Sequence, residues 1–172
     1  MATASYAAVK SGDGGISFIS IHEPIGFGDA LRLLFECWDK VRNGRTMPAR
    51  SDFDPLSLPR DLLANMFLLE VQHQPRRFQF RRMGTAVAEM LGEDWTGKYL
   101  DELPKANQQV IDQYEETVEK QAPTDFHNQY IKIDPPLRRK RMMHYRRLLL
   151  PLSNDDKVVN MLMGATSITP VD

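Results

Sequence analysis

A change of residue periodicity at Gly84 limits most strongly how this chain folds. Before this glycine, Phe78 and Phe80 alternate with polar residues at the period of a half-buried strand. After it, apolar residues recur three and four positions apart, which is helical spacing, as far as Gly92. Glycine adopts the left-handed backbone at a helix C-terminus without a side-chain clash. The stretch 76–103 therefore predicts a strand that runs directly into a short helix, followed by a compact apolar linker.

The 172 residues are expected to form one domain, because a chain of this length buries roughly 70% of its unfolded surface. With 42% hydrophobic and 26% charged residues, the composition is that of a soluble globular protein. The one cysteine, Cys37, excludes an internal disulfide and indicates a reducing compartment. No apolar run reaches the roughly 20 residues of a membrane span, and the first residues carry no secretion signal. We therefore expect a cytoplasmic protein without a membrane partner.

Four segments are expected along the chain. Residues 1–28 are predicted to be a flexible N-terminal arm, in which 16–21 form either a short strand or an arm lying on another surface. Residues 29–60 contain a helix and a proline-rich wrapping connector, residues 61–168 form the core, and 169–172 are a tail. Within the core, two strand patterns, a set of helices and three more strand patterns predict an α+β fold.

The N-terminal helix carries a single apolar stripe made of Leu31, Leu34, Phe35 and Trp38. Two interpretations remain open. The stripe either packs on the sheet of its own domain, or it also pairs with a second copy of the chain. The stripe is rich in large side chains for one short helix, and an apolar segment at 16–21 precedes it. We therefore predict a homodimer in which these four residues contribute to the interface.

Charge is distributed unevenly, although the net charge is only −1. Acidic residues dominate from 89 to 119, and basic residues dominate from 123 to 147. The densest basic run, at the expected tip of a hairpin, consists of Arg138, Arg139, Lys140 and Arg141. It is either a solvated tip that discourages pairing of strand edges or a contact for an acidic protein partner. Nucleic acid is not expected, because few aromatic residues flank the run.

The sequence shows no arrangement typical of a catalytic or metal centre. The four histidines are scattered, and none has the spacing of a metal-binding pair on a helix. Asp125 and His127 lie two apart on one strand without a nucleophile nearby. Cys37, among leucines on a helix, is typical of a small buried hydrophobic residue. We predict neither catalytic residues nor metal ligands.

Several short segments, in the same order as the predicted elements, resemble the PAS fold, and more narrowly the bacterial single-domain PAS-like family with an added N-terminal helix. They are Trp38, residues 47–55, Gly84-Thr85, and residues 92–100, 147–153 and 161–164. The resemblance covers about residues 30–166. It implies a five-stranded antiparallel sheet with helices on one face, preceded by the N-terminal amphipathic helix. It also implies a non-enzymatic sensory or docking module that holds its ligand, when there is one, between the sheet and the helices.

Cofactors that some PAS domains carry are not indicated here. The region 84–101 has no cysteine for a covalent flavin, and the long helix has no histidine for haem. A small organic ligand of unknown identity remains possible under this reading.

The resemblance places a pocket, or a filled core of the same composition, where the concave face of the sheet meets the helices. Strand alternation puts Arg82 on this face with Phe78 and Phe80, although the family resemblance leads us to expect an apolar residue there. Arg82 then extends to solvent at the strand end, pairs with an acid from 89–102, or holds an anion at the pocket mouth. The predicted ligand-binding residues are Phe67, Phe80, Arg82, Met83, Val87, Met90, Leu91, Tyr114, Tyr145, Leu149 and Met161.

Two other functions remain open at this point. One is a small enzyme of the isomerase or hydrolase type, built on a similar curved sheet. The other is a docking module that uses the basic hairpin without a ligand. An enzyme needs a pair of ionisable groups facing the pocket, and no carboxylate or histidine obviously faces Arg82. The sequence therefore favours the regulatory module.

Overall fold

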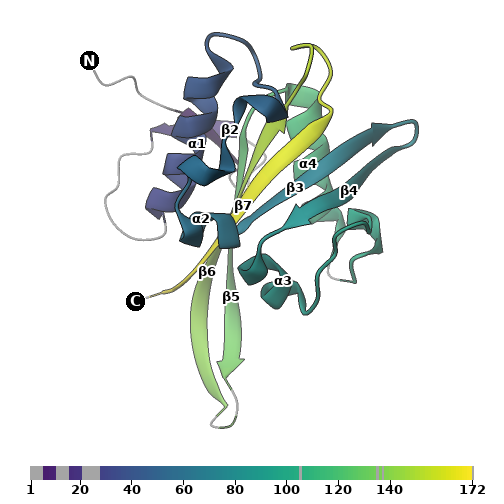
Figure 1. The fold of residues 1–172 in the computed structure, drawn as a ribbon. Helices are drawn as coiled ribbons and strands as arrows, with labels where there is room; N and C mark the ends of the chain where they lie inside the picture. Colours follow the sequence, from purple (N-terminus) through teal and green to yellow (C-terminus); the bar gives the residue numbers. More distant parts are fainter. Residues whose placement is uncertain are drawn as a thin grey trace.

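The computed structural model of this chain describes residues 6–10, 16–20, 28–104, 106–134, 136 and 138–171. They form one seven-stranded sheet, in the order β2-β1-β5-β6-β7-β3-β4, with helices packed against it (Figure 1). The strands are β1 (Tyr6–Lys10), β2 (Ile16–Ser20), β3 (Met66–His73), β4 (Arg76–Met83), β5 (Thr124–Asp134), β6 (Arg139–Leu152) and β7 (Met161–Pro170). The helices are α1 (Gly28–Arg42), α2 (Arg60–Ala64), α3 (Thr85–Leu91) and α4 (Gln108–Lys120), with 3-10 turns η1 (Arg50–Asp52), η2 (Pro55–Ser57) and η3 (Leu100–Glu102).

The five predicted core strands form a continuous antiparallel array, β5-β6-β7-β3-β4. This confirms the α+β fold class and the N-terminal helix. The hairpin of β1 and β2 extends the sheet, and β1 pairs in parallel with the start of β5. Of the two alternatives for 16–21, residues 16–20 form the strand. The rest of the predicted arm lies outside the described residues, so its flexibility and the segment boundaries stay predictions.

Helices lie on both sides of the sheet. Figure 1 shows α1 on one side of β6 and β7, with α3 and α4 on the other. Side chains on β3 alternate accordingly. The ring of Phe67 stacks near Tyr114 of α4, with 6.5 Å between the centroids, whereas Leu68 faces Phe53 of the connector and Arg82 across a small cavity. The helices that follow the sheet strands, α3 and α4, therefore share one face, and α1 covers the other.

The apolar stripe of α1 lies in the interior of the single chain. Leu31, Leu34, Phe35 and Trp38 are 0–5% exposed, and α1 packs against β6 and β7. The indole N–H of Trp38 donates a hydrogen bond of 2.9 Å to the carbonyl of Pro151 on β6. The structure thus corresponds to the first interpretation, packing on the domain's own sheet. These four residues have no free surface for a second copy, and the predicted homodimer stays a prediction that needs another surface.

The connector after α1 begins at the far end of the same face. The carbonyl of Pro48 accepts a hydrogen bond of 2.9 Å from the backbone N–H of Ser153. The carboxylate of Asp156 accepts from the backbone N–H groups of Thr46 and Met47, at 3.2 and 2.8 Å. Met47 is fully buried. The start of the connector, residues 46–48, is therefore attached to the segment between β6 and β7.

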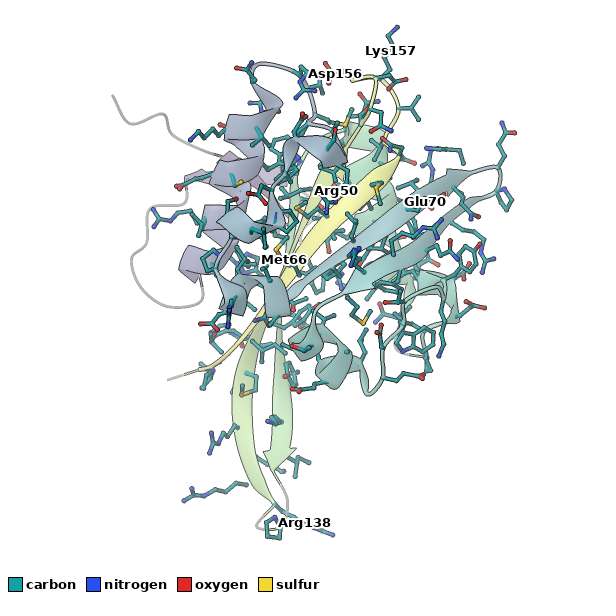
Figure 2. All side chains as sticks on the ribbon, in the orientation of Figure 1. Arg50, Met66, Glu70, Arg138, Asp156 and Lys157 are labelled. Atoms are coloured by element: carbon teal, nitrogen blue, oxygen red, sulfur yellow. The ribbon has the colours of Figure 1, made fainter. Side chains whose placement is uncertain are left out.

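The β5–β6 hairpin projects beyond the rest of the sheet, and Arg138 lies at its end (Figures 1 and 2). All four residues of the basic run 138–141 are exposed. Ile131 and Ile133 on β5 are also exposed, each at 56%. No described helix is both long enough and apolar enough to cross a lipid bilayer.

Candidate functional site

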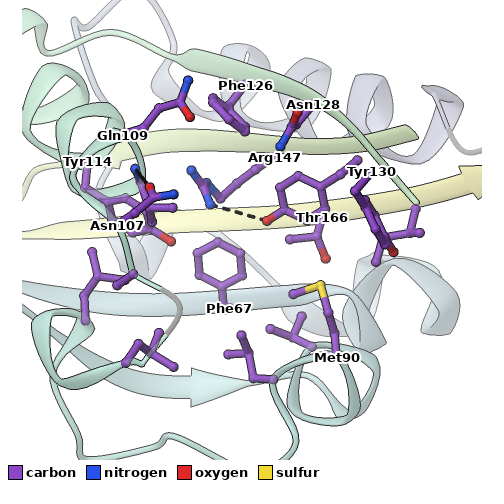
Figure 3. A pocket seen from close by; sticks show the side chains of 18 of the residues that line it. Phe67, Met90, Asn107, Gln109, Tyr114, Phe126, Asn128, Tyr130, Arg147 and Thr166 are labelled. Atoms are coloured by element: carbon purple, nitrogen blue, oxygen red, sulfur yellow. Dashed lines mark hydrogen bonds between the residues drawn. The ribbon is translucent and has the colours of Figure 1, made fainter. Parts of the chain in front are cut away.

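A cavity of about 370 Å³ lies between the sheet and the α3–α4 side of the molecule (Figure 3). This volume is within the range of small-molecule sites, roughly 300–1,000 Å³. Its apolar wall comes from Phe67 of β3, Phe80 of β4 and three residues of α3, with Leu100, Leu103 and Val110 after them. Its polar groups come from the N-terminal end of α4 and from β5, β6 and β7.

The change of periodicity at Gly84 has the predicted structural result. β4 ends at Met83, and α3 begins directly at Thr85 and ends at Gly92, whose φ is +88°. The backbone of Gly84 lies close to α2, because a side-chain carbon there would be 2.2 Å from the carbonyl oxygen of Ala64. This close approach sets α3 across the edge of the sheet. The helix thereby turns Val87, Met90 and Leu91 toward the cavity.

Seven of the eleven predicted ligand-binding residues line this cavity: Phe67, Phe80, Val87, Met90, Leu91, Tyr114 and Tyr145. Two others, Arg82 and Met83, line a second cavity of about 190 Å³ against the connector. Leu149 is fully buried and Met161 is half-buried against the core, and neither lines a described cavity. The structure thus brings most of the predicted set together, and whether the set binds a ligand stays a prediction.

A β-bulge in β4 explains the position of Arg82. Leu68 pairs with Arg82, but Leu69 pairs with Phe80, so Arg81 is an extra residue in the strand. Strict alternation would have placed Arg82 beside Phe80, whereas the bulge turns it to the opposite face. Arg81 itself pairs with Glu70. Arg82 is exposed and has no ion-pair partner among the described residues, so of the alternatives it extends to solvent and does not pair with an acid from 89–102.

The central charged group of the cavity is Arg147 of β6, which is not among the predicted residues. Its side chain is only 5% exposed and lies among three aromatic rings (Figure 3). The guanidinium carbon is 5.3 Å from the ring centroid of Tyr114, 5.1 Å from Phe126 and 5.8 Å from Tyr145. Such cation–π contacts stabilise a desolvated cation.

A signal for Arg147 exists in the sequence. Tyr145 and Leu149 are both predicted to face the pocket, and Arg147 lies midway between them on the same strand. Residues at i and i+2 of a strand share a face. The alternation therefore assigns Arg147 to the pocket, although its charge groups it with the basic run at the hairpin tip.

Gln113 of α4 holds Arg147 in place. The Nε of Arg147 donates a hydrogen bond of 2.8 Å to Oε1 of Gln113. The amide nitrogen of Gln113 donates in turn to the carbonyl oxygens of Thr124 and Arg147, at 3.3 and 3.2 Å. Thr117 donates a hydrogen bond of 2.7 Å to the carbonyl of Gln113. This buried network fixes the guanidinium relative to both α4 and the sheet.

The other nitrogens of the guanidinium are less well satisfied. Nη1 of Arg147 lies 3.4 Å from the hydroxyl of Tyr145, a long hydrogen bond (Figure 3). Nη2 is buried without a hydrogen-bond partner among the described residues. Of the described residues that line the cavity, Arg147 alone carries a charge. The cavity is thus lined by one buried cation whose guanidinium is only partly hydrogen-bonded.

Tyr114 contributes a neutral hydroxyl to the same wall. Burial raises the pKa of this phenol well above its usual range, and the positive charge of Arg147 opposes that rise only partly. The phenol therefore stays protonated at physiological pH. Tyrosine hydroxyls of this kind orient a ligand by hydrogen bonding without adding charge.

Asp125 and His127, the one acid–base pair noted in the sequence, lie away from the cavity. The carboxylate of Asp125 is buried and accepts hydrogen bonds from His127, at 3.0 Å, and from Arg146. Phe126 lies between these two residues on β5 and pairs with Arg147 of β6. Both Phe126 and Arg147 point to the other face of the sheet, toward the cavity. Among the described residues, no three His, Cys, Asp or Glu side chains gather as metal ligands do.

Comparison with known protein families identifies one family. No curated protein matches the chain significantly. The PAS domain family matches residues 28–167, which include α1, the connector, four of the five core strands and most of β7. Domains of this family are in general sensory and regulatory modules. The chain therefore belongs to the PAS domain family.

Proposed function

We propose that this protein is a non-enzymatic PAS sensory module that binds a small organic ligand in the cavity between the sheet and α3–α4. The cavity of about 370 Å³ carries this proposal. A filled core of the same composition was the alternative, and an open volume of this size favours the ligand. Bound ligand would bridge α3, α4 and the sheet, so occupancy changes how firmly these elements hold together.

The lining favours binding over catalysis. General acid–base chemistry needs two ionisable groups that converge on a reacting atom. The described lining residues provide one arginine, and otherwise amides, hydroxyls and apolar side chains. These groups orient a ligand without transferring protons, which supports the regulatory module over an isomerase or hydrolase.

Ligand binding should stabilise the fold. At a hundredfold excess over Kd, a ligand raises the free energy of unfolding by about 2.7 kcal/mol. For a domain of this size we expect Tm to rise by roughly 5–10 °C. The measurement is native mass spectrometry of protein taken directly from cells, followed by a thermal-shift screen of acidic, aromatic and fatty metabolites.

A pair of adjacent glutamines provides the matched control. Gln109 lines the cavity, whereas Gln108 is equally exposed on the same turn of α4 and forms a hydrogen bond with Asp112 outside the cavity. Gln109→Trp should reduce or abolish the thermal shift, and Gln108→Trp should keep it. No retained mass and no shift with any compound would contradict ligand binding and leave a protein-docking module.

Docking without a ligand is the second candidate, and the projecting β5–β6 hairpin supports it. Its tip presents Arg138, Arg139, Lys140 and Arg141 next to exposed Ile131 and Ile133. Basic and apolar side chains together suit an acidic protein partner. The homodimer, this partner and a cytoplasmic location all remain proposals that rest on the sequence.

A further inference from the structure

We propose that the cavity selects small monocarboxylates with an aromatic or aliphatic body, and that the guanidinium of Arg147 holds the carboxylate. This inference rests on the proposed function, because it names the class of ligand for the same cavity. It is carried by the state of one guanidinium, which is a separate observation from the volume of the cavity.

The guanidinium of Arg147 is only partly hydrogen-bonded. A guanidinium has five N–H donors. Nε is used by Gln113 at 2.8 Å, and Nη1 makes only the long contact of 3.4 Å with Tyr145. Nη2 is buried and has no partner among the described residues. Buried polar groups are almost always hydrogen-bonded, so a guanidinium that lines a cavity with one full hydrogen bond and one long one indicates a missing acceptor.

Arg147 has no carboxylate counter-ion in the described part of the chain. The nearest carboxylates on the elements around Arg147 are engaged elsewhere. Asp125 pairs with Arg146 on the opposite face of the sheet, and on α4 Glu115 pairs with Arg76 at 2.9 Å. Glu116 pairs with Lys120. An unpaired buried charge is strongly unfavourable, and a bound anion would neutralise it.

The residues that line the cavity determine which charge and shape of ligand it fits. Arg147 is the one charged group among the described lining residues, so the site balances a single negative charge. A dianion such as a phosphate would leave a negative charge buried without a partner. Phe67, Phe80 and Met90 form an apolar wall for the rest of the molecule, and methionine adapts to more than one shape. A monocarboxylate with an apolar body meets both conditions.

The guanidinium of Arg147 is preorganised for binding. Gln113 and the rings of Tyr114, Phe126 and Tyr145 hold the guanidinium in position in the absence of a ligand. A ligand therefore does not have to order this side chain when it binds. Preorganised donors bind more tightly than mobile ones, because less conformational entropy is lost.

The test compares acids with amides of the same shape. The probes are 3-phenylpropanoate with 3-phenylpropanamide, and octanoate with octanamide, titrated by calorimetry at neutral pH. We expect at least one acid to bind about 10- to 100-fold more tightly than its amide, as for a buried charge-assisted hydrogen bond. Arg147→Gln should remove this preference, and Arg147→Lys, which keeps the charge but not the planar fork, should retain part of it.

Arg82→Gln is the matched control, because it removes an arginine that lines the second cavity and not this one. It should leave the preference for acids unchanged. Circular dichroism and a cooperative thermal transition establish that each variant folds. The comparison of acid with amide on the unmodified protein does not depend on any variant.

Each result has a defined meaning. Equal binding of acids and amides overturns the anion assignment and leaves the ligand-binding function intact. A preference that survives in Arg147→Gln but is lost in Arg82→Gln overturns the role of Arg147. Binding of amides alone also overturns the inference. If no probe binds and protein from cells carries no bound mass, the proposed function fails together with it.

Discussion

Trp38→Ala is expected to lower the free energy of unfolding by about 3–5 kcal/mol, the usual effect of removing a fully buried large aromatic ring. Trp38 is 3% exposed, and its ring stacks near Phe35 with 6.2 Å between the centroids. The substitution also leaves the carbonyl of Pro151 without its indole donor. Chemical denaturation followed by far-ultraviolet circular dichroism measures the change.

Leu33→Ala is the control for this prediction. Leu33 belongs to the same helix but is 41% exposed, so the change should alter the free energy of unfolding by less than about 0.5 kcal/mol. Light scattering at tens of micromolar gives the mass of each variant. A halved mass for Trp38→Ala with unchanged unfolding would show that the stripe forms an interface, in contradiction to its burial in the single chain.

Gln113→Leu is expected to destabilise the fold by about 3 kcal/mol, because it leaves a charged donor and several carbonyl groups buried without partners. Gln113 is 5% exposed and connects Arg147, Thr124 and Thr117 in one network. Leucine fills a similar volume but makes none of the side-chain hydrogen bonds to Arg147 and Thr124, whereas the bond from Thr117 to the backbone carbonyl of residue 113 stays. Urea denaturation provides the measurement.

The double variant Gln113→Leu with Arg147→Met tests whether the damage comes from the unpaired guanidinium. Replacing both partners by apolar groups of similar size is often nearly neutral or stabilising. We therefore expect the double variant to recover to within about 1 kcal/mol of the parent protein. Additive losses from the two substitutions would mean that Gln113 stabilises the fold independently of Arg147.

Much of the architecture was predictable because it depends on local patterns. The alternation at Phe78 and Phe80, the helical spacing after Gly84 and the left-handed Gly92 each give one element by themselves. The order of these elements then matched the PAS fold, which the family comparison confirms. Burial of the α1 stripe followed from the same reasoning, as one of two alternatives.

The parts that were not predicted depend on contacts between distant segments. Pairing of β1 with β5 joins residues more than a hundred positions apart, and neither segment carries a mark of it. The bulge at Arg81 depends on how β4 pairs with β3, and it moves Arg82 to the other face. Both are settled by the sheet as a whole, so local alternation gives the wrong side for Arg82.

Arg147 is a different case, because alternation from Tyr145 would have given the correct face but was not applied to this residue. A run of basic residues on an exposed hairpin tip suggested one solvated cluster. In the structure this strand passes from the exposed tip into the core, and the environment changes from exposed at Arg141 to buried at Arg147. Whether a charged residue on a long strand is exposed or buried therefore depends more on its position along the strand than on the charges of its neighbours in sequence.

Gly164 affects the volume of the cavity, although it is not one of the residues that line it. This glycine of β7 pairs with Phe67 of β3, and a side-chain carbon there would lie 2.1 Å from the ring of Phe67. The ring stands between this glycine and the cavity, and the rings of Phe80 and Tyr114 limit its movement to the sides. Alanine at 164 would push the ring toward the open space. The volume of the cavity is thus adjustable at a residue that does not line it.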